Sequence, residues 1–217
     1  MAHRLLPFRQ YDENDVVNLF SLNADSLGTD LKLMKPGDND INADGVLVSV
    51  QNGDLVDVND LSEDTRFMHS YSSPVGRNPY PTNPLKVEPA ASGARALGVT
   101  LNQTLAVDEN GESLLFNPVK KDELQAVLSG QTVPVLSKGI ITVHESAILA
   151  KHAPLPKVEV GSEVACVGHG QFGAYTGAGA SLGRVIATGH RGANRTSTNN
   201  VLADFQSGQY YVIQLDC

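Results

Sequence analysis

A chain of 217 residues is long enough for one good-sized hydrophobic core or for two small domains. Its formal net charge of −8 argues against nucleic-acid binding, which needs a basic face to displace counterions from phosphates. Twenty glycines, eleven prolines and no tryptophan favour many short strands and turns over long helices. We therefore expect a mainly β protein.

No run of the sequence approaches the roughly 18 apolar residues that a membrane span requires. The N-terminal residues also lack the apolar core of a signal peptide. We expect a soluble protein that is made in a cytoplasm and has no membrane partner. The two cysteines, Cys166 and Cys217, do not make a disulfide framework.

Charge is unevenly distributed along the chain. Residues 10–64 hold thirteen of the 24 acidic residues, whereas residues 164–203 hold none and carry three arginines. Such an asymmetry suits self-assembly or docking on another protein, and a solvated acidic face is the plainer alternative.

Residues 1–30 are predicted to form an extended N-terminal arm. The segment HRLLPFRQ is short and apolar, and Pro7 holds it extended. The next segment, YDENDVVNLFSL, predicts an amphipathic helix capped by Asp12, because Val16, Leu19 and Phe20 fall at helical spacing. Since such a segment has little to pack on by itself, we expect it to bind a partner surface.

Residues 31–94 combine short strands with a proline-rich stretch. Asn52-Gly53 is a plausible tight hairpin turn between two of these strands. Residues 73–92 contain five of the eleven prolines. Because proline lacks the N–H group that strand pairing uses, we expect this stretch to be an extended excursion or a linker, excluded from any central strand.

The segment DINADGVLVSVQ in this middle region matches part of a calcium-binding loop. Asp40, Asn42 and Asp44 occupy the first three ligand positions, and Gly45 occupies the position of the sharp turn. The twelfth position is Gln51 and not the bidentate glutamate, and no flanking helices are predicted. We interpret the segment as an Asx-rich turn, with weak calcium binding as the alternative.

Residues 95–217 are predicted to form a compact β-rich domain, divisible into modules 95–155 and 156–217. Short strands separated by glycine turns favour a small sandwich or barrel. The expected strands are residues 96–101, 132–137, 139–144, 163–168, 182–189 and 210–217.

One helix is expected within this domain, over residues 118–130. Pro118 suits its first turn and Gly130 its end. Its expected buried stripe comprises Leu124, Val127 and Leu128.

The glycine-rich tract contains two short matches to enzyme motifs. G-x-G-x-x-G at residues 168–173 needs a following helix and an acid about twenty residues on, but more glycines follow and that position is Thr188. G-x-S-x-G around Ser181 needs a strand-to-helix turn and a histidine after the acid, yet the last histidine is His190, before the next acid. The six histidines are scattered without zinc-ligand spacing. We expect no catalytic residue, cofactor or metal, and keep a hydrolase acting at Ser181 as the least favoured hypothesis.

Several segments resemble virion proteins of tailed bacteriophages, and most closely capsid decoration (cement) proteins. They are LLPFRQYDENDVVNLFSL, ARALGVTLNQTL, TVPVLSKGIITV, GSEVACVG, GQFGAYTGAGASLGRVIATG and YYVIQLDC. The resemblance is one of general pattern and leaves out the proline-rich middle. It implies small β-sandwich or barrel modules with one short helix and an extended N-terminal arm.

The resemblance also implies a function without catalytic residues. Such a protein is a homotrimer on the capsid exterior that binds the major capsid protein and stabilises the shell. A tail or head-fibre component is the alternative. On this interpretation the N-terminal arm binds the coat protein. The alternative is that the arm packs on the protein's own body. The expected anchors of the arm are Leu5, Leu6, Phe8, Val16, Leu19 and Phe20.

Overall fold

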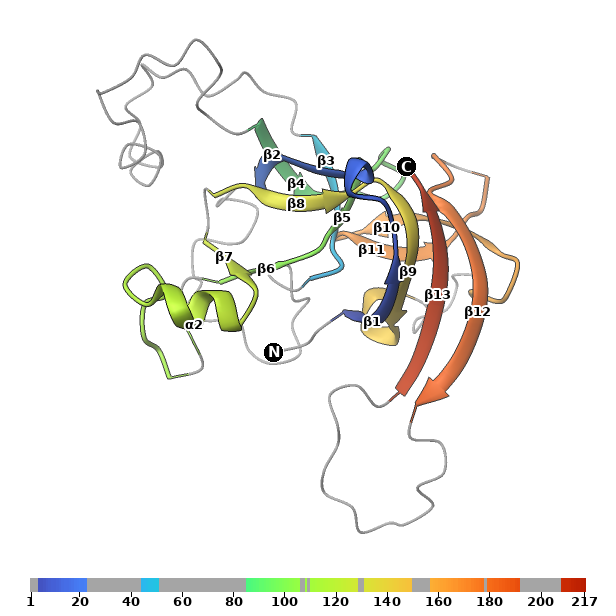
Figure 1. Ribbon diagram of the computed structural model, residues 1–217. Helices are drawn as coiled ribbons and strands as arrows, with labels where there is room; N and C mark the ends of the chain where they lie inside the picture. The colour runs from blue at the N-terminus through green and yellow to red at the C-terminus, as the bar shows by residue number, and fades with distance from the viewer. Residues whose placement is uncertain are drawn as a thin grey trace.

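The computed structural model describes residues 4–22, 44–50, 85–105, 108, 110–128, 131–149, 157–177, 179–191 and 208–217 (Figure 1). Within these residues the protein is mainly β, which confirms the predicted fold class. An antiparallel six-stranded sheet lies beside a closed five-stranded barrel, and the described part of the chain contains one short α-helix.

The sheet has the order β1 (Leu5–Gln10), β9 (Lys138–His144), β13 (Gly208–Asp216), β12 (Gly183–Arg191), β10 (Glu163–Gly168) and β11 (Gln171–Ala174). The barrel has the order β2 (Val16–Leu22), β4 (Leu85–Pro89), β3 (Leu47–Val50), β5 (Gly98–Thr100) and β8 (Val133–Leu136). Its strands pair antiparallel except β2 and β4, which are parallel.

Two strand pairs run continuously from the sheet into the barrel. β1 pairs with β9, and their neighbours along the chain, β2 and β8, pair with each other. At the crossing point the Ser137 N–H donates to the Asp15 carbonyl oxygen at 2.9 Å. Figure 1 shows β1 and β9 side by side between the barrel and the long curved strands β12 and β13. Sheet and barrel are therefore tied together by backbone hydrogen bonds.

One core serves both layers. β13 buries alternate residues toward it, as the two-residue period of a strand requires. The main cluster joins side chains of the barrel to side chains of the sheet, among them Leu47, Val99, Leu136, Ile141, Val143, Ile213 and Leu215. A second, smaller cluster consists of buried valines on or next to the barrel strands, at Val46, Val48, Val87, Val133 and Val135.

The predicted division into segments 1–30, 31–94 and 95–217 does not separate structural units. The barrel takes β2 from the first segment, β3 and β4 from the second, and β5 and β8 from the third. The sheet likewise pairs β9 with β13 across the proposed module boundary at residue 155.

All six strands that we expected in the C-terminal part are present, as β5, β8, β9, β10, β12 and β13. The exclusion of the proline-rich stretch from central strands is wrong at its end, because β4 lies between β2 and β3. Pro89 is the last residue of that strand, so the preceding residues keep their N–H groups, and Ala90 donates to the Leu47 carbonyl oxygen at 2.9 Å. Residues 73–84 and the Asn52-Gly53 turn lie outside the described residues.

The expected helix is real but shorter than predicted, at α2 (Pro118–Glu123). Pro118 stands in its first turn, and the Asn117 side chain caps it by accepting from the Lys120 N–H at 3.3 Å. The helix ends at Leu124 because Gln125 turns to a positive φ of 49° and the chain then forms β7 (Ala126–Val127). β7 pairs with β6 (Gln103–Thr104), so Val127 is buried in a strand and not in a helical stripe.

Candidate partner-binding surface at the N-terminal strand

The N-terminal arm is part of the folded body. Leu5 and Leu6 pair with Val143 and Thr142 of β9, and their side chains are 3% and 1% exposed. The expectation that these two leucines bind a partner is therefore wrong. Burial in the protein's own core removes both from water and occupies the apolar surface that a partner would need.

The predicted helix at residues 11–22 is also wrong. Asp12 does cap a helical turn, because its carboxylate accepts from the Asn14 N–H at 2.9 Å, but the turn is a single 3-10 turn, η1 (Glu13–Asp15). The chain continues as β2, where the β-branched pair Val16-Val17 aligns with β8. Val16 is half-buried against the core. The side chains of Leu19 and Phe20 lie outside the described residues.

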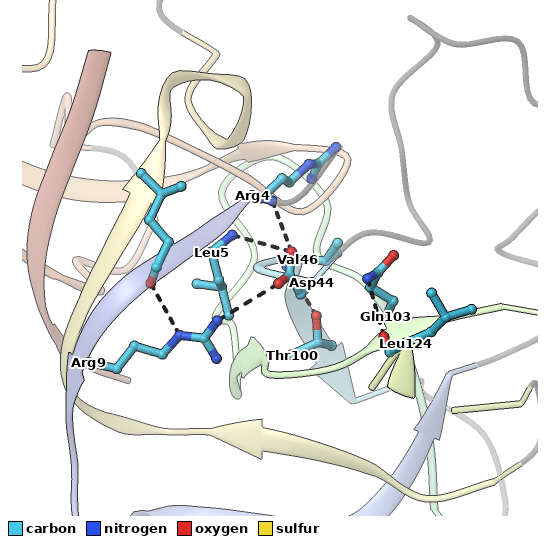
Figure 2. Close-up of polar contacts among 9 residues, drawn as sticks. Arg4, Leu5, Arg9, Asp44, Val46, Thr100, Gln103 and Leu124 are labelled. Carbon is cyan, nitrogen blue, oxygen red and sulfur yellow. Dashed lines mark hydrogen bonds and ion pairs between the residues drawn. The ribbon is translucent and has the colours of Figure 1, made fainter. Parts of the chain in front are cut away.

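A buried carboxylate fixes the start of β1 (Figure 2). Asp44 accepts from the backbone N–H of Arg4 at 2.9 Å and of Leu5 at 3.3 Å. Its second oxygen lies 4.0 Å from the Arg9 guanidinium. Bonds from N–H groups to a buried carboxylate are stronger than neutral ones, so this contact holds the first strand on the body.

The same contacts bear on the calcium alternative. Asp44 directs its carboxylate at the backbone of β1, and Asp40 and Asn42 lie outside the described residues. Across the described ranges, no three side chains of His, Cys, Asp or Glu are grouped so that they could hold a metal ion.

β1 carries a bulge that turns Phe8 outward. Leu6 aligns with Thr142 and Gln10 with Ile140, so three residues of β1 face the single residue Ile141. Phe8 lies at the centre of this bulge with a positive φ of 80°, and its side chain is 69% exposed. Its carbonyl oxygen accepts from the Thr142 hydroxyl at 3.0 Å. Of the six predicted anchors, Phe8 is the one that the structure places in solvent with its side chain described.

Sequence reasoning missed a second group of exposed apolar side chains at the start of α2. Phe116 is 83% exposed, and Val119 and Leu115 are also exposed. The sequence signal that could have found them is Pro118, which predicts where the helix begins. Phe116 lies directly before the capping residue Asn117. The stripe that the sequence predicts as buried, Leu124, Val127 and Leu128, lies at the other end of this segment and does not include them.

The glycine tract forms a hairpin and a following strand. His169 and Gly170 make the turn between β10 and β11, with φ of 49° and 64°, as a two-residue hairpin turn requires. Gly170 also packs closely on β3, since a Cβ there would lie 2.7 Å from the Leu47 carbonyl oxygen. β11 and β12 stand where each enzyme motif needs a helix, and Ser181 precedes β12.

Cys166 and His144 both make contacts with the surrounding backbone. Burial raises the pKa of the Cys166 thiol, whose sulfur contacts the Ala90 carbonyl oxygen at 3.2 Å. His144 caps the 3-10 turn η4 (Glu145–Ala147), where its ring nitrogen accepts from the Ser146 N–H at 3.2 Å. The same ring nitrogen lies 3.0 Å from the Ser146 hydroxyl oxygen, so this turn also brings a hydroxyl group to an imidazole.

In the described parts of the chain, no helix combines the length and apolar character that crossing a membrane demands. Comparison with protein-family models, with curated proteins and with solved structures finds no match.

Proposed function

We propose that this chain is a virion structural protein, a capsid decoration (cement) protein. It binds the outer surface of the shell formed by the major capsid protein and stabilises that shell. It is made in the host cytoplasm, carried on the capsid exterior, and acts as a homotrimer without catalysing a reaction.

The observation that carries the proposal is the place of the resembling segments in the fold. They include β1, β5, β8 and β9 together with β10 to β13, and the segments as a whole supply most of the buried residues of the shared core. The segments with the likeness therefore form one packed body and are not scattered over unrelated elements. The uneven charge, with an acid-free stretch from residue 164 to residue 203, supports self-association.

Stabilisation of a shell needs no moving or reacting part. A protein that binds the assembled shell and not its free subunits lowers the free energy of the assembled state alone. Because β1 and β2 are built into the sheet and the barrel, we propose that contact occurs through the rigid body surface and not through a loose arm. Exposed apolar side chains such as Phe8 and Phe116 supply contact area on that surface.

Sedimentation tests the proposal directly. Expanded empty shells, assembled from the coat protein of the virus that encodes this chain, are mixed with the purified protein and pelleted. We expect saturable co-sedimentation and a higher dissociation temperature of the decorated shells. Unassembled coat subunits serve as the control, and they should not retain the protein. Protein that stays in the supernatant with shells present contradicts the proposal.

A further inference from the structure

We infer that the open edge of β12, residues 186–190, pairs with an acidic strand from a second copy of this chain, residues 54–61. The inference deepens the homotrimer of the proposed function and rests on it. Three observations support it: the unequal pairing of β12 on its two sides, the residue types along its open edge, and the charge around that edge.

β12 is paired unequally on its two sides. On one side it aligns with β13 from Gly183 to Arg191. On the other side only Gly183 and Arg184 align with β10. In the described parts of the chain, residues 186–190 therefore have a strand neighbour on one side alone. Figure 1 shows β12 at the margin of the long curved strands, with β13 on its inner side.

The register assigns the backbone groups that this edge presents. The Val185 N–H donates to the Ser162 carbonyl oxygen at 2.9 Å, on the side away from β13. The bulge that follows Val185 shifts the alternation by one residue. Since bonded and non-bonded pairs alternate along an antiparallel ladder, Thr188 and His190 also direct their N–H and C=O groups away from β13. These groups are the donors and acceptors that an added strand needs.

The open edge lacks most of the protection that edge strands usually carry. Proteins prevent strand addition with proline, lysine, bulges or inward-pointing charges. Residues 186–190 read IATGH and contain neither proline nor lysine, and the Ile186 side chain is 43% exposed. The bulge at the start of the edge is one such device, but the ladder with β13 is regular from Ala187 to Arg191. The edge is therefore a template for an added strand.

The charge around the edge favours an acidic strand. β12 carries Arg184 and Arg191 and lies within the acid-free stretch of residues 164–203. The adjoining part of β13, residues 208–213, has no charged side chain. Opposite charges on neighbouring strands stabilise pairing and like charges oppose it. Pairing of β12 with β12 of a second copy would bring arginines together, so the occupant is a different segment.

Residues 54–61 have the sequence that matches this edge. They read DLVDVNDL, in which three aspartates are interspersed with leucine and the β-branched valine, a residue type that favours strands. This segment lies outside the described residues. β3, which precedes it in the chain, already pairs with β4 and β5, whereas β12 has an open edge. An edge on one copy and a strand from the next make a heterologous contact, which can close into a ring such as a trimer.

Two variants of the full chain separate the edge from the strand. Thr188→Pro removes an outward N–H of β12 and no hydrogen bond to β13. Thr188→Val keeps that N–H and is the matched control. The second variant combines Asp54→Lys, Asp57→Lys and Asp60→Lys and reverses the charge of the strand. Sedimentation velocity should show wild-type trimers, unchanged in Thr188→Val. In each of the two variants the dissociation constant should rise at least about ten-fold.

Mixing the two variants tests whether the contact joins different copies. The charge-reversed variant keeps an intact edge, and Thr188→Pro keeps an intact acidic strand. An equimolar mixture should therefore form one-to-one dimers, although each variant alone remains largely monomeric. Added salt should weaken the association of the wild type, because the charges lie at an exposed edge.

Three results overturn the inference. Thr188→Pro associates as the wild type does, or the charge-reversed variant does, or the mixture stays monomeric, which places the acidic segment on its own chain or elsewhere. If Thr188→Pro lowers the Tm, Ile186→Lys replaces it, since an exposed lysine also blocks an edge; unchanged association of that variant overturns the inference too. A monomeric wild type overturns the inference and the homotrimer. Co-sedimentation of the wild type with coat-protein shells tests the decoration role separately, so the two failures are distinguishable.

Discussion

Leu5→Ala tests whether the N-terminal strand belongs to the fold. Leu5 is buried in the main core cluster and pairs with Val143 of β9. Truncating a buried leucine removes its transfer free energy and leaves a cavity, which together cost about 3 kcal/mol. For a chain of this size, each kcal/mol lowers the Tm by roughly 2–4 °C, so the expected decrease is about 6–12 °C.

Urea denaturation followed by circular dichroism measures this change, and a thermal scan supplies the Tm. Leu115→Ala is the matched control, because Leu115 is 46% exposed and its truncation should change the free energy of unfolding by less than about 0.5 kcal/mol. If Leu5→Ala is as stable as this control, the N-terminal segment is a free arm and the account of β1 given above is wrong.

Three further substitutions test particular contacts. Asp44→Ala removes the acceptor of two backbone N–H groups at the start of β1 and should cost about 1–3 kcal/mol in urea denaturation, whereas Asp44→Asn, which keeps one side-chain oxygen, should cost less. Gly170→Ala adds a Cβ against β3 at a positive φ and should lower the free energy of unfolding by about 2–5 kcal/mol. The control Gly161→Ala, at a positive φ but in open space, should lower it by about 1–2 kcal/mol. Equal losses contradict the close packing of the hairpin on β3. Burial, with a contribution from the adjacent carboxylate, raises the pKa of Cys217 from 9.0 to about 12. The unfolded thiol therefore loses its proton first, and the free energy of unfolding should fall as the pH rises from about 9 toward about 12. Cys217→Ser should make this fall shallower, which unfolding curves at about pH 8 and about pH 10 can check.

The sequence predicts most strands of the C-terminal half because their signal is local. Residues 139–144 and 163–168 are β-branched or small runs bounded by turn residues, and they form β9 and β10. The hairpin between β10 and β11 was not predicted, because one of its two turn residues is His169, a residue type that adopts a positive φ less readily than Gly170.

The N-terminal elements could not be predicted in the same way. Val16, Leu19 and Phe20 fit a helical period, but the same segment also fits a strand. It forms a strand because it pairs with β8, which lies more than a hundred residues away in the sequence. The Asp44 contact also joins residues forty positions apart, so the composition of the first segment says nothing about it. The burial of Leu5 and Leu6 depends on these distant partners.

The residues of the candidate surface could not be identified from the local sequence either. An apolar N-terminal segment indicates that some of its residues bind a surface, and this reasoning includes Phe8. It cannot separate Phe8 from Leu6, because the bulge that separates them is defined by the register with β9. The exposed residues at the start of α2 were missed because the predicted stripe, Leu124, Val127 and Leu128, concerned only the other end of the segment.

Cryo-electron microscopy of the intact virus particle tests the central claim most directly. The account predicts density that fits this sheet and barrel at many symmetry-related positions on the outer surface of the shell, in contact with neighbouring coat subunits. Particles that lack this density, or that carry it only at the tail or at a single vertex, contradict the assignment as a decoration protein.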